Sequence, residues 1–278
     1  MARYGLVFNV ERCDGCYACF LACKDEFTDN SHLPTSESTC VGENLIKVSE
    51  VQYGTHDKVK VDYVHTLCQH CQNPACMAKF PEEISMRPDG IVIIDPVKAK
   101  GKKEIVGSCP YGAITWNEKL EIPQKCTMCA HMLDAGEKVT RCFECCPNQA
   151  IMFGDLDDPN SEIAKYVAEH ADELEQLHPE YGTKPSVYYR HLPKPFICGE
   201  VVFGDTGACA KDVKVTCKCT ECGTEYETTT DFLGDFEFRF LPTNKNFVVT
   251  ATADGYKPYT AEVKTAASVN LGEMFLEK

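Results

Sequence analysis

Cysteine spacing constrains this chain more than any other feature of its sequence. The 278 residues include 19 cysteines, and most of these fall in tight groups with two residues between neighbours. A chain of this length can bury a core without disulfide staples, and secreted disulfide frameworks space their cysteines widely. The cysteines therefore indicate metal chemistry in a reducing compartment.

The first group reads Cys13-x2-Cys16-x2-Cys19-x3-Cys23. This is the run found in bacterial ferredoxins, in which three thiolates hold one 4Fe-4S cubane and the fourth reaches a second cubane. Zinc takes four ligands in two pairs and has no use for four cysteines packed so closely. The spacing therefore favours iron-sulfur clusters over zinc.

The next two groups are incomplete. The second group supplies only Cys68, Cys71 and Cys76, because Phe80 stands where a fourth ligand is expected. The third group keeps only Cys109, followed by Pro110, and Lys102 and Ile105 stand where its other ligands would lie. The fourth group is complete, although an insertion separates its two halves: Cys126, Cys129, Cys142 and Cys146.

Crossed pairing of these groups predicts three clusters. In ferredoxins the first three ligands of one group share a cluster with the last ligand of the partner group. The outer two groups predict a first quartet of Cys13, Cys16, Cys19 and Cys146. They also predict a second quartet of Cys23, Cys126, Cys129 and Cys142. The inner two groups predict a third quartet of Cys68, Cys71, Cys76 and Cys109. Every ligand of a fourth cluster is absent, so these twelve cysteines predict three 4Fe-4S clusters as the metal sites, with no catalytic residue.

The remaining cysteines lack a complete ligand set. We expect the following to act as small buried hydrophobic residues: Cys40, Cys145, Cys198 and Cys209. Cys217, Cys219 and Cys222 offer three thiolates without a nearby histidine, so a zinc site there is the weaker alternative. His70 and His131 lie inside cluster loops, and we expect them to donate hydrogen bonds to cluster sulfur.

The pattern of apolar residues divides the chain into three parts. Residues 1–155 form the cluster domain, in which segment 109–116 is repeated by segment 146–153 as a Cys-Pro turn leading into a strand. Residues 156–195 predict an amphipathic helix over 161–178, with Ser161 as its N-cap. A proline-rich extended arm over 179–195 follows, which contacts a partner or serves as a simple linker.

Residues 196–278 alternate apolar and polar positions in short runs, which predicts strands. These runs are 200–203, 212–216, 235–240, 246–253 and 260–263. The predicted fold class is therefore α+β: a ferredoxin-like iron-sulfur domain with inserted loops, then an antiparallel β-sandwich of the immunoglobulin-like or prealbumin-like kind.

Charge and hydropathy limit the partners. The formal net charge is −14, which argues against binding to nucleic acid or to anionic lipid. No apolar run approaches the roughly 20 residues of a membrane span, and the N-terminal residues lack a signal-peptide pattern. We expect a cytoplasmic protein without direct membrane insertion.

The order of the cysteine groups, with the insertion between Cys129 and Cys142, resembles the iron-sulfur subunits of molybdopterin oxidoreductases related to dimethyl sulfoxide reductase. Other matching segments are 90–104, 109–112, 116–118, 124–131 and 182–189. The resemblance implies an electron-transfer subunit in a heterodimer with a large catalytic subunit. That partner would hold molybdenum and molybdopterin guanine dinucleotide.

Within this family the resemblance implies hydroxyl transfer between polyhydroxylated aromatics, carried out in the partner subunit of an anaerobic enzyme. In four-cluster relatives, the cluster that is missing here lies farthest from molybdenum and next to a membrane acceptor. Three alternatives remain: an electron-delivery subunit of a reductase such as a catechol dehydroxylase, a free-standing polyferredoxin, and a zinc-bound interaction protein.

Overall fold

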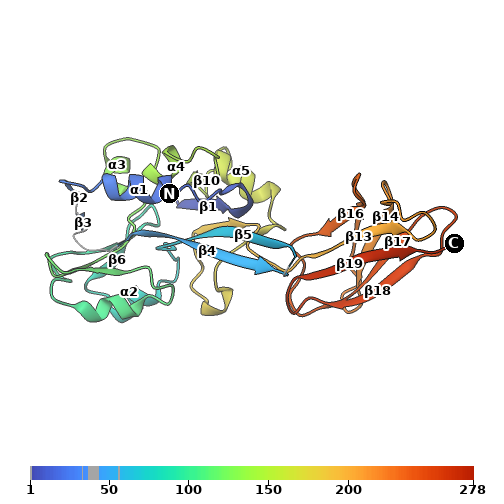
Figure 1. The fold of residues 1–278 in the computed structure, drawn as a ribbon. Coiled ribbons are helices and arrows are strands. Elements are labelled where there is room, and N and C mark those ends of the chain that lie inside the picture. The colour runs from blue at the N-terminus through green and yellow to red at the C-terminus, as the bar shows by residue number, and fades with distance from the viewer. Residues whose placement is uncertain (1, 33, 37–43, 56) are drawn as a thin grey trace. The chain divides into compact units, whose positions relative to one another are not determined.

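β1 (Tyr4–Asn9) is an inner strand of the four-stranded sheet in the cysteine-rich part of the chain. The computed structural model describes residues 2–32, 34–36, 44–55 and 57–278. Leu6, Val7 and Phe8 of this strand are all buried, so both faces of the strand are covered. β1 pairs antiparallel with β10 (Ile151–Asp155), as Figure 1 shows. On its other side β1 pairs parallel with β12 (Val187–Arg190), and β11 (Leu174–Glu175) pairs with β12.

Short helices and two-stranded ribbons connect the cysteine-bearing loops. The helices are α1 (Ala18–Asp25), α2 (Ala75–Lys79), α3 (Ala130–Asp134), α4 (Arg141–Glu144) and α5 (Glu162–Glu169), with 3-10 turns η1 (Val10–Arg12), η2 (Lys103–Ser108) and η3 (Pro179–Tyr181). The ribbons are β2 (Ser31–His32) with β3 (Thr35–Ser36), β4 (Ile46–Gly54) with β5 (Val59–Leu67), β6 (Ile84–Met86) with β7 (Val92–Ile94), and β8 (Thr115–Asn117) with β9 (Ile122–Gln124). In the described part of the chain, no helix is long and apolar enough to cross a membrane.

The chain divides into two units. The first comprises residues 1–50 and 62–192, and the second comprises residues 51–61 and 193–278. The last residues of β4 and the first residues of β5 therefore belong to the C-terminal unit. The sequence pattern did not indicate this. The expected borders at residues 155 and 195 stay a prediction.

Two sheets form the C-terminal unit. One has the order β16 (Asp235–Phe238), β13 (Ile197–Phe203), β19 (Val269–Leu276), and the other has the order β15 (Glu225–Thr229), β14 (Lys214–Cys219), β17 (Asn246–Thr252), β18 (Tyr259–Lys264). The expectation of purely antiparallel pairing is wrong at one place, because β13 and β19 are parallel. The prediction also missed β15, whose residues are largely exposed, and β19, where Gly272 interrupts the alternation.

Two predictions for residues 156–195 need correction. The helix ends at Glu169 rather than at residue 178, because Leu174 and Glu175 pair with β12 instead of continuing the helix. Its predicted N-cap is confirmed, since the Ser161 hydroxyl accepts a hydrogen bond from the Ala164 amide at 3.1 Å. Part of the predicted arm is β12, and its Tyr189 is fully buried in this chain's own sheet. Contact between the rest of the segment and a partner stays a prediction.

Candidate iron-sulfur cluster sites

The first quartet gathers around one pocket. Cys13 and Cys16 lie in the loop before α1, and Cys19 lies in its first turn. Cys146 follows α4, more than a hundred residues later, and lines the same pocket. The pairing of β1 with β10 explains this meeting, because η1 follows β1 and Cys146 precedes β10.

The second quartet joins three short helices. Cys23 lies in α1, Cys129 is the N-cap of α3, and Cys142 lies in α4. The charges of Cys126, Cys142 and Cys129 all raise the pKa of Cys23, after the larger effect of its burial. The four thiols are therefore near neighbours.

The third quartet lines a second pocket, together with Tyr111, Lys125 and Thr183. The residues that stand where the ligands of a fourth cluster would be expected lie beside this pocket. Phe80 and Ile105 pack there in an apolar core with Cys76, Ile84 and Val92, and Ile105 is completely buried. Lys102 instead forms an ion pair with Glu83. Hydrophobic packing thus fills the positions where these ligands are missing.

Left-handed backbone conformations shape the cysteine loops. Gly15 has φ +71°, and a Cβ atom placed there would lie 2.3 Å from the Tyr63 ring. A larger residue would therefore need both a rare backbone conformation and displacement of an aromatic ring. The predicted internal repeat is also visible, since Gly112 and Gln149 both adopt left-handed φ three residues after Cys109 and Cys146.

Backbone amides point at several cysteine sulfurs. The Ala150 amide donates to Cys146 Sγ at 3.2 Å, and the Met128 amide donates to Cys126 Sγ at 3.4 Å. Such donors stabilise thiolate over thiol. This is the environment that a cluster held by four thiolates requires.

Burial opposes ionisation of the free thiols. It raises the pKa of Cys19 and of Cys71 to about 12, and that of Cys76 and of Cys129 to about 11. The metal-free chain would therefore hold these protons at neutral pH, and metal binding would release them. A thiol that is costly to ionise alone becomes a favourable ligand once a cationic iron centre shares the site. The cysteines of each quartet therefore fit a 4Fe-4S cluster.

His65 and Lys125 lie beside the cysteines, although no sequence pattern predicts them there. His65 Nε2 lies 3.5 Å from Cys19 Sγ, and burial lowers the pKa of His65 to about 4, so the ring is neutral. Lys125 is 3% exposed, and its ammonium group donates to the carbonyl oxygens of Val92 and Cys126. Its charge lies close enough to lower the pKa of Cys76 and Cys126, against the larger effect of burial. No spacing rule marks either residue, although Lys125 stands next to a ligand.

The two predicted histidine donors behave differently. His70 is fully buried, and its Nδ1 accepts the amide hydrogen of Val92 at 3.1 Å. Its Nε2 is buried without a partner among the described residues, so donation to cluster sulfur stays a prediction. His131 Nε2 instead bonds Glu26 Oε1 at 2.8 Å, so this nitrogen does not serve a cysteine.

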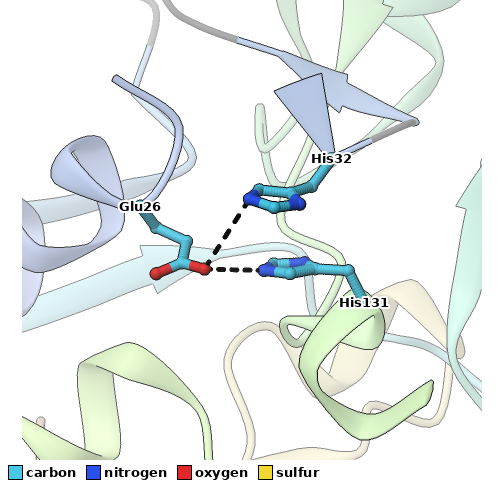
Figure 2. Close-up of side chains that lie close together, drawn as sticks. All are labelled: Glu26, His32 and His131. Atoms are coloured by element: carbon cyan, nitrogen blue, oxygen red, sulfur yellow. Dashed lines mark hydrogen bonds and ion pairs between the residues drawn. The ribbon is translucent and has the colours of Figure 1, made fainter. Parts of the chain in front are cut away.

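Figure 2 shows Glu26, His32 and His131 pointing toward one another. They lie near the second quartet, since the charge of Glu26 raises the pKa of Cys129, after the larger effect of burial. Glu26 Oε1 lies 4.0 Å from His32 Nε2, and the Glu26 carboxylate also binds Arg141. The two imidazole rings are stacked, with centroids 4.2 Å apart and planes 11° apart. An imidazole lone pair lies in the plane of its ring, so two rings stacked face to face direct their lone pairs into separate parallel planes and not at one ion. We therefore interpret this group as a hydrogen-bonded junction rather than a metal centre.

The cysteines outside the quartets divide by burial. Cys198 is buried as expected, whereas Cys209 is exposed, so that prediction is wrong; Cys40 lies outside the described residues. Cys145 is half-buried, and its thiol donates to the Cys142 carbonyl.

Cys217 and Cys219 lie in β14, and Cys222 lies in the turn after it. Cys217 and Cys219 are fully buried in the sandwich core, and Cys222 is exposed. Within the described residues these three thiols do not form a group tight enough for one ion.

Comparison with known proteins identifies the two units. Residues 59–156 match the 4Fe-4S dicluster domain, and residues 197–272 match the carboxypeptidase regulatory-like domain. The chain is 38% identical over 280 residues to the pyrogallol hydroxytransferase small subunit of Pelobacter acidigallici, and the alignment covers 98% of each chain. This chain belongs to the iron-sulfur subunits of the molybdopterin oxidoreductases.

Other members of this family align over less of the chain. A tetrathionate reductase subunit of Salmonella typhimurium is 34% identical, covering 70% of this chain and 75% of its own length. A putative dimethyl sulfoxide reductase iron-sulfur subunit of Halobacterium salinarum is 35% identical, covering 68% of this chain and 79% of its own length. The chain is therefore an electron-transfer subunit that carries 4Fe-4S clusters and is not itself the catalytic subunit of its enzyme.

Proposed function

We propose that this chain holds three 4Fe-4S clusters, one on each quartet, and serves an enzyme that transfers hydroxyl groups between polyhydroxylated aromatics. A 4Fe-4S cluster accepts and returns single electrons when bound. The residues of this chain supply the thiolates, exclude water around them and direct amide hydrogens at their sulfurs.

One observation carries the assignment of the reaction. The alignment with the pyrogallol hydroxytransferase small subunit runs through both units, including the C-terminal sandwich, whereas the reductase subunits align with about 70% of this chain. We propose that this sandwich is immunoglobulin-like or prealbumin-like. The partner is a large subunit that holds molybdenum and molybdopterin guanine dinucleotide and binds the aromatic substrate, in a cytoplasmic heterodimer.

An anaerobic assay of the purified complex tests the reaction. Hydroxyl transfer between two aromatics is redox-neutral, so we expect pyrogallol to turn over without an external electron donor. Strict dependence on a reduced donor would instead establish the second candidate, an electron-delivery subunit of a reductase, which the reductase relatives favour. Gel filtration near 31 kDa without a partner would indicate a free-standing polyferredoxin.

Iron analysis tests the number of clusters. We expect about twelve irons per chain in oxygen-protected material, because each cubane holds four. A value near eight or sixteen would contradict the three-quartet assignment, whatever reaction the complex catalyses.

A further inference from the structure

His65 is a histidine in β5 that approaches a predicted cluster ligand from outside the cysteine groups. Its Nε2 lies 3.5 Å from the Sγ atom of Cys19, and the ring lines the pocket of the first quartet. The residue is 2% exposed, so water does not compete for this contact. The distance is within the range of a hydrogen bond to sulfur.

Packing fixes the ring in this position. The imidazole stacks on Phe8 of β1, with centroids 4.6 Å apart and planes 19° apart. The Tyr189 hydroxyl donates to the His65 carbonyl at 2.8 Å, and the Gln69 amide donates to that hydroxyl at 3.1 Å. Both the backbone and the ring of His65 are thus held by the core sheet.

The surroundings of the ring select one tautomer. A neutral imidazole carries one N–H group. Nδ1 is buried and has no hydrogen-bond partner among the described residues. A proton on Nδ1 would leave a buried donor unpaired and would turn the Nε2 lone pair toward a thiolate. The Nε2–H tautomer avoids both costs and donates to Cys19.

We propose that His65 is a positioning residue that donates a hydrogen bond to Cys19 and raises the reduction potential of the cluster on the first quartet. Reduction adds negative charge that the cysteine sulfurs share, and a donor to sulfur stabilises the reduced form more than the oxidised form. The proposal rests on the part of the proposed function that puts a cluster on this quartet, and it is independent of the reaction catalysed.

The test uses the intact complex and two variants of this residue. His65→Phe keeps an aromatic ring against Phe8 and removes the N–H group, whereas His65→Gln supplies an amide N–H donor. His170→Phe is the matched control, because His170 packs on Tyr166 and does not line the pocket of the first or the third quartet. Midpoint potentials are measured by redox titration followed by electron paramagnetic resonance, with iron content measured in parallel.

We expect the potential of one cluster to fall in His65→Phe and to recover in His65→Gln, while His170→Phe matches the native complex. A tenfold lower reduction constant corresponds to about 59 mV for a one-electron couple. An unchanged potential in His65→Phe with full iron content would overturn the proposal. An iron content far from twelve in the native complex would instead refute the three-cluster assignment.

A second measurement applies if His65→Phe loses its cluster. In protein labelled with ¹⁵N-histidine, we expect a nitrogen coupling to the reduced cluster in the native complex and its loss in His65→Gln. Identical couplings in the two proteins would contradict the hydrogen bond.

Discussion

Burial and local donors give the cysteines of this chain opposite acid-base behaviour. Most quartet thiols have a pKa raised by burial, which makes their ionisation depend on the metal. Cys222 is exposed, and hydrogen bonds with Cys219 and Thr224 lower its pKa to about 7. The Cys222 amide in turn donates to Cys219 Sγ at 3.3 Å.

Cys222 should therefore be a readily alkylated thiol of the C-terminal unit. Its pKa lies below the ordinary value, so the reactive thiolate is present above about pH 7 and is lost as the pH falls below it. We expect iodoacetamide labelling of Cys222 to rise steeply between pH 6 and pH 8, as measured by peptide mass spectrometry. Cys198, which is buried and has a raised pKa, is the internal control. Equal labelling of Cys222 at both pH values would contradict this prediction.

At the scale of elements, one ion-pair junction holds together the helices of the second quartet. Glu26 follows α1, His131 lies in α3 and Arg141 begins α4 (Figure 2 shows the first two). Burial opposes ionisation of Glu26, but hydrogen bonds from Arg141 and His131 outweigh it and hold the Glu26 pKa below its usual value. The helices themselves are too short to be stable alone, so such contacts set their positions.

Glu26→Gln should loosen the second quartet. The amide keeps the shape of the side chain but removes the charge that binds Arg141, at a cost of about 1–2 kcal/mol. We expect faster loss of about four irons per chain to a chelator under anaerobic conditions, measured by absorbance. Glu144→Gln is the control, because Glu144 pairs with the same Arg141 but is exposed. Equal release rates in both variants would argue against a role of the junction in holding the quartet.

At the scale of the whole molecule, the C-terminal unit includes a piece of chain from the N-terminal half. Lys60 binds Glu237 at 2.9 Å, and its ammonium group lies 5.4 Å from the centre of the Phe196 ring. Tyr53 contacts the same ring edge-on. Residues 51–61 thus contribute to the stability of a unit whose other residues begin at 193.

Lys60→Ala should destabilise the C-terminal unit alone. Loss of a half-buried ion pair and a cation–π contact costs about 1 kcal/mol, which shifts the unfolding midpoint of a domain of this size by about 4–8 °C. Anaerobic calorimetry would show this shift in one of two transitions, with iron content unchanged. Lys218→Ala, at an exposed position of β14, is the control. A single transition that shifts as a whole would contradict the prediction, because it would show that the two units unfold together.

The sequence by itself predicted the four cysteine groups, because the spacing of ligands within one group is a local property. The same local rules predicted the Ser161 cap and most strands of the sandwich. Tertiary structure alone decided where the helix after Ser161 ends, since strand pairing competes with helix formation only when distant segments meet. It alone brought His65 and Lys125 to the cysteines, and it placed residues 51–61 in the C-terminal unit. These contacts join residues far apart in the chain, and no local pattern encodes the packing that creates them.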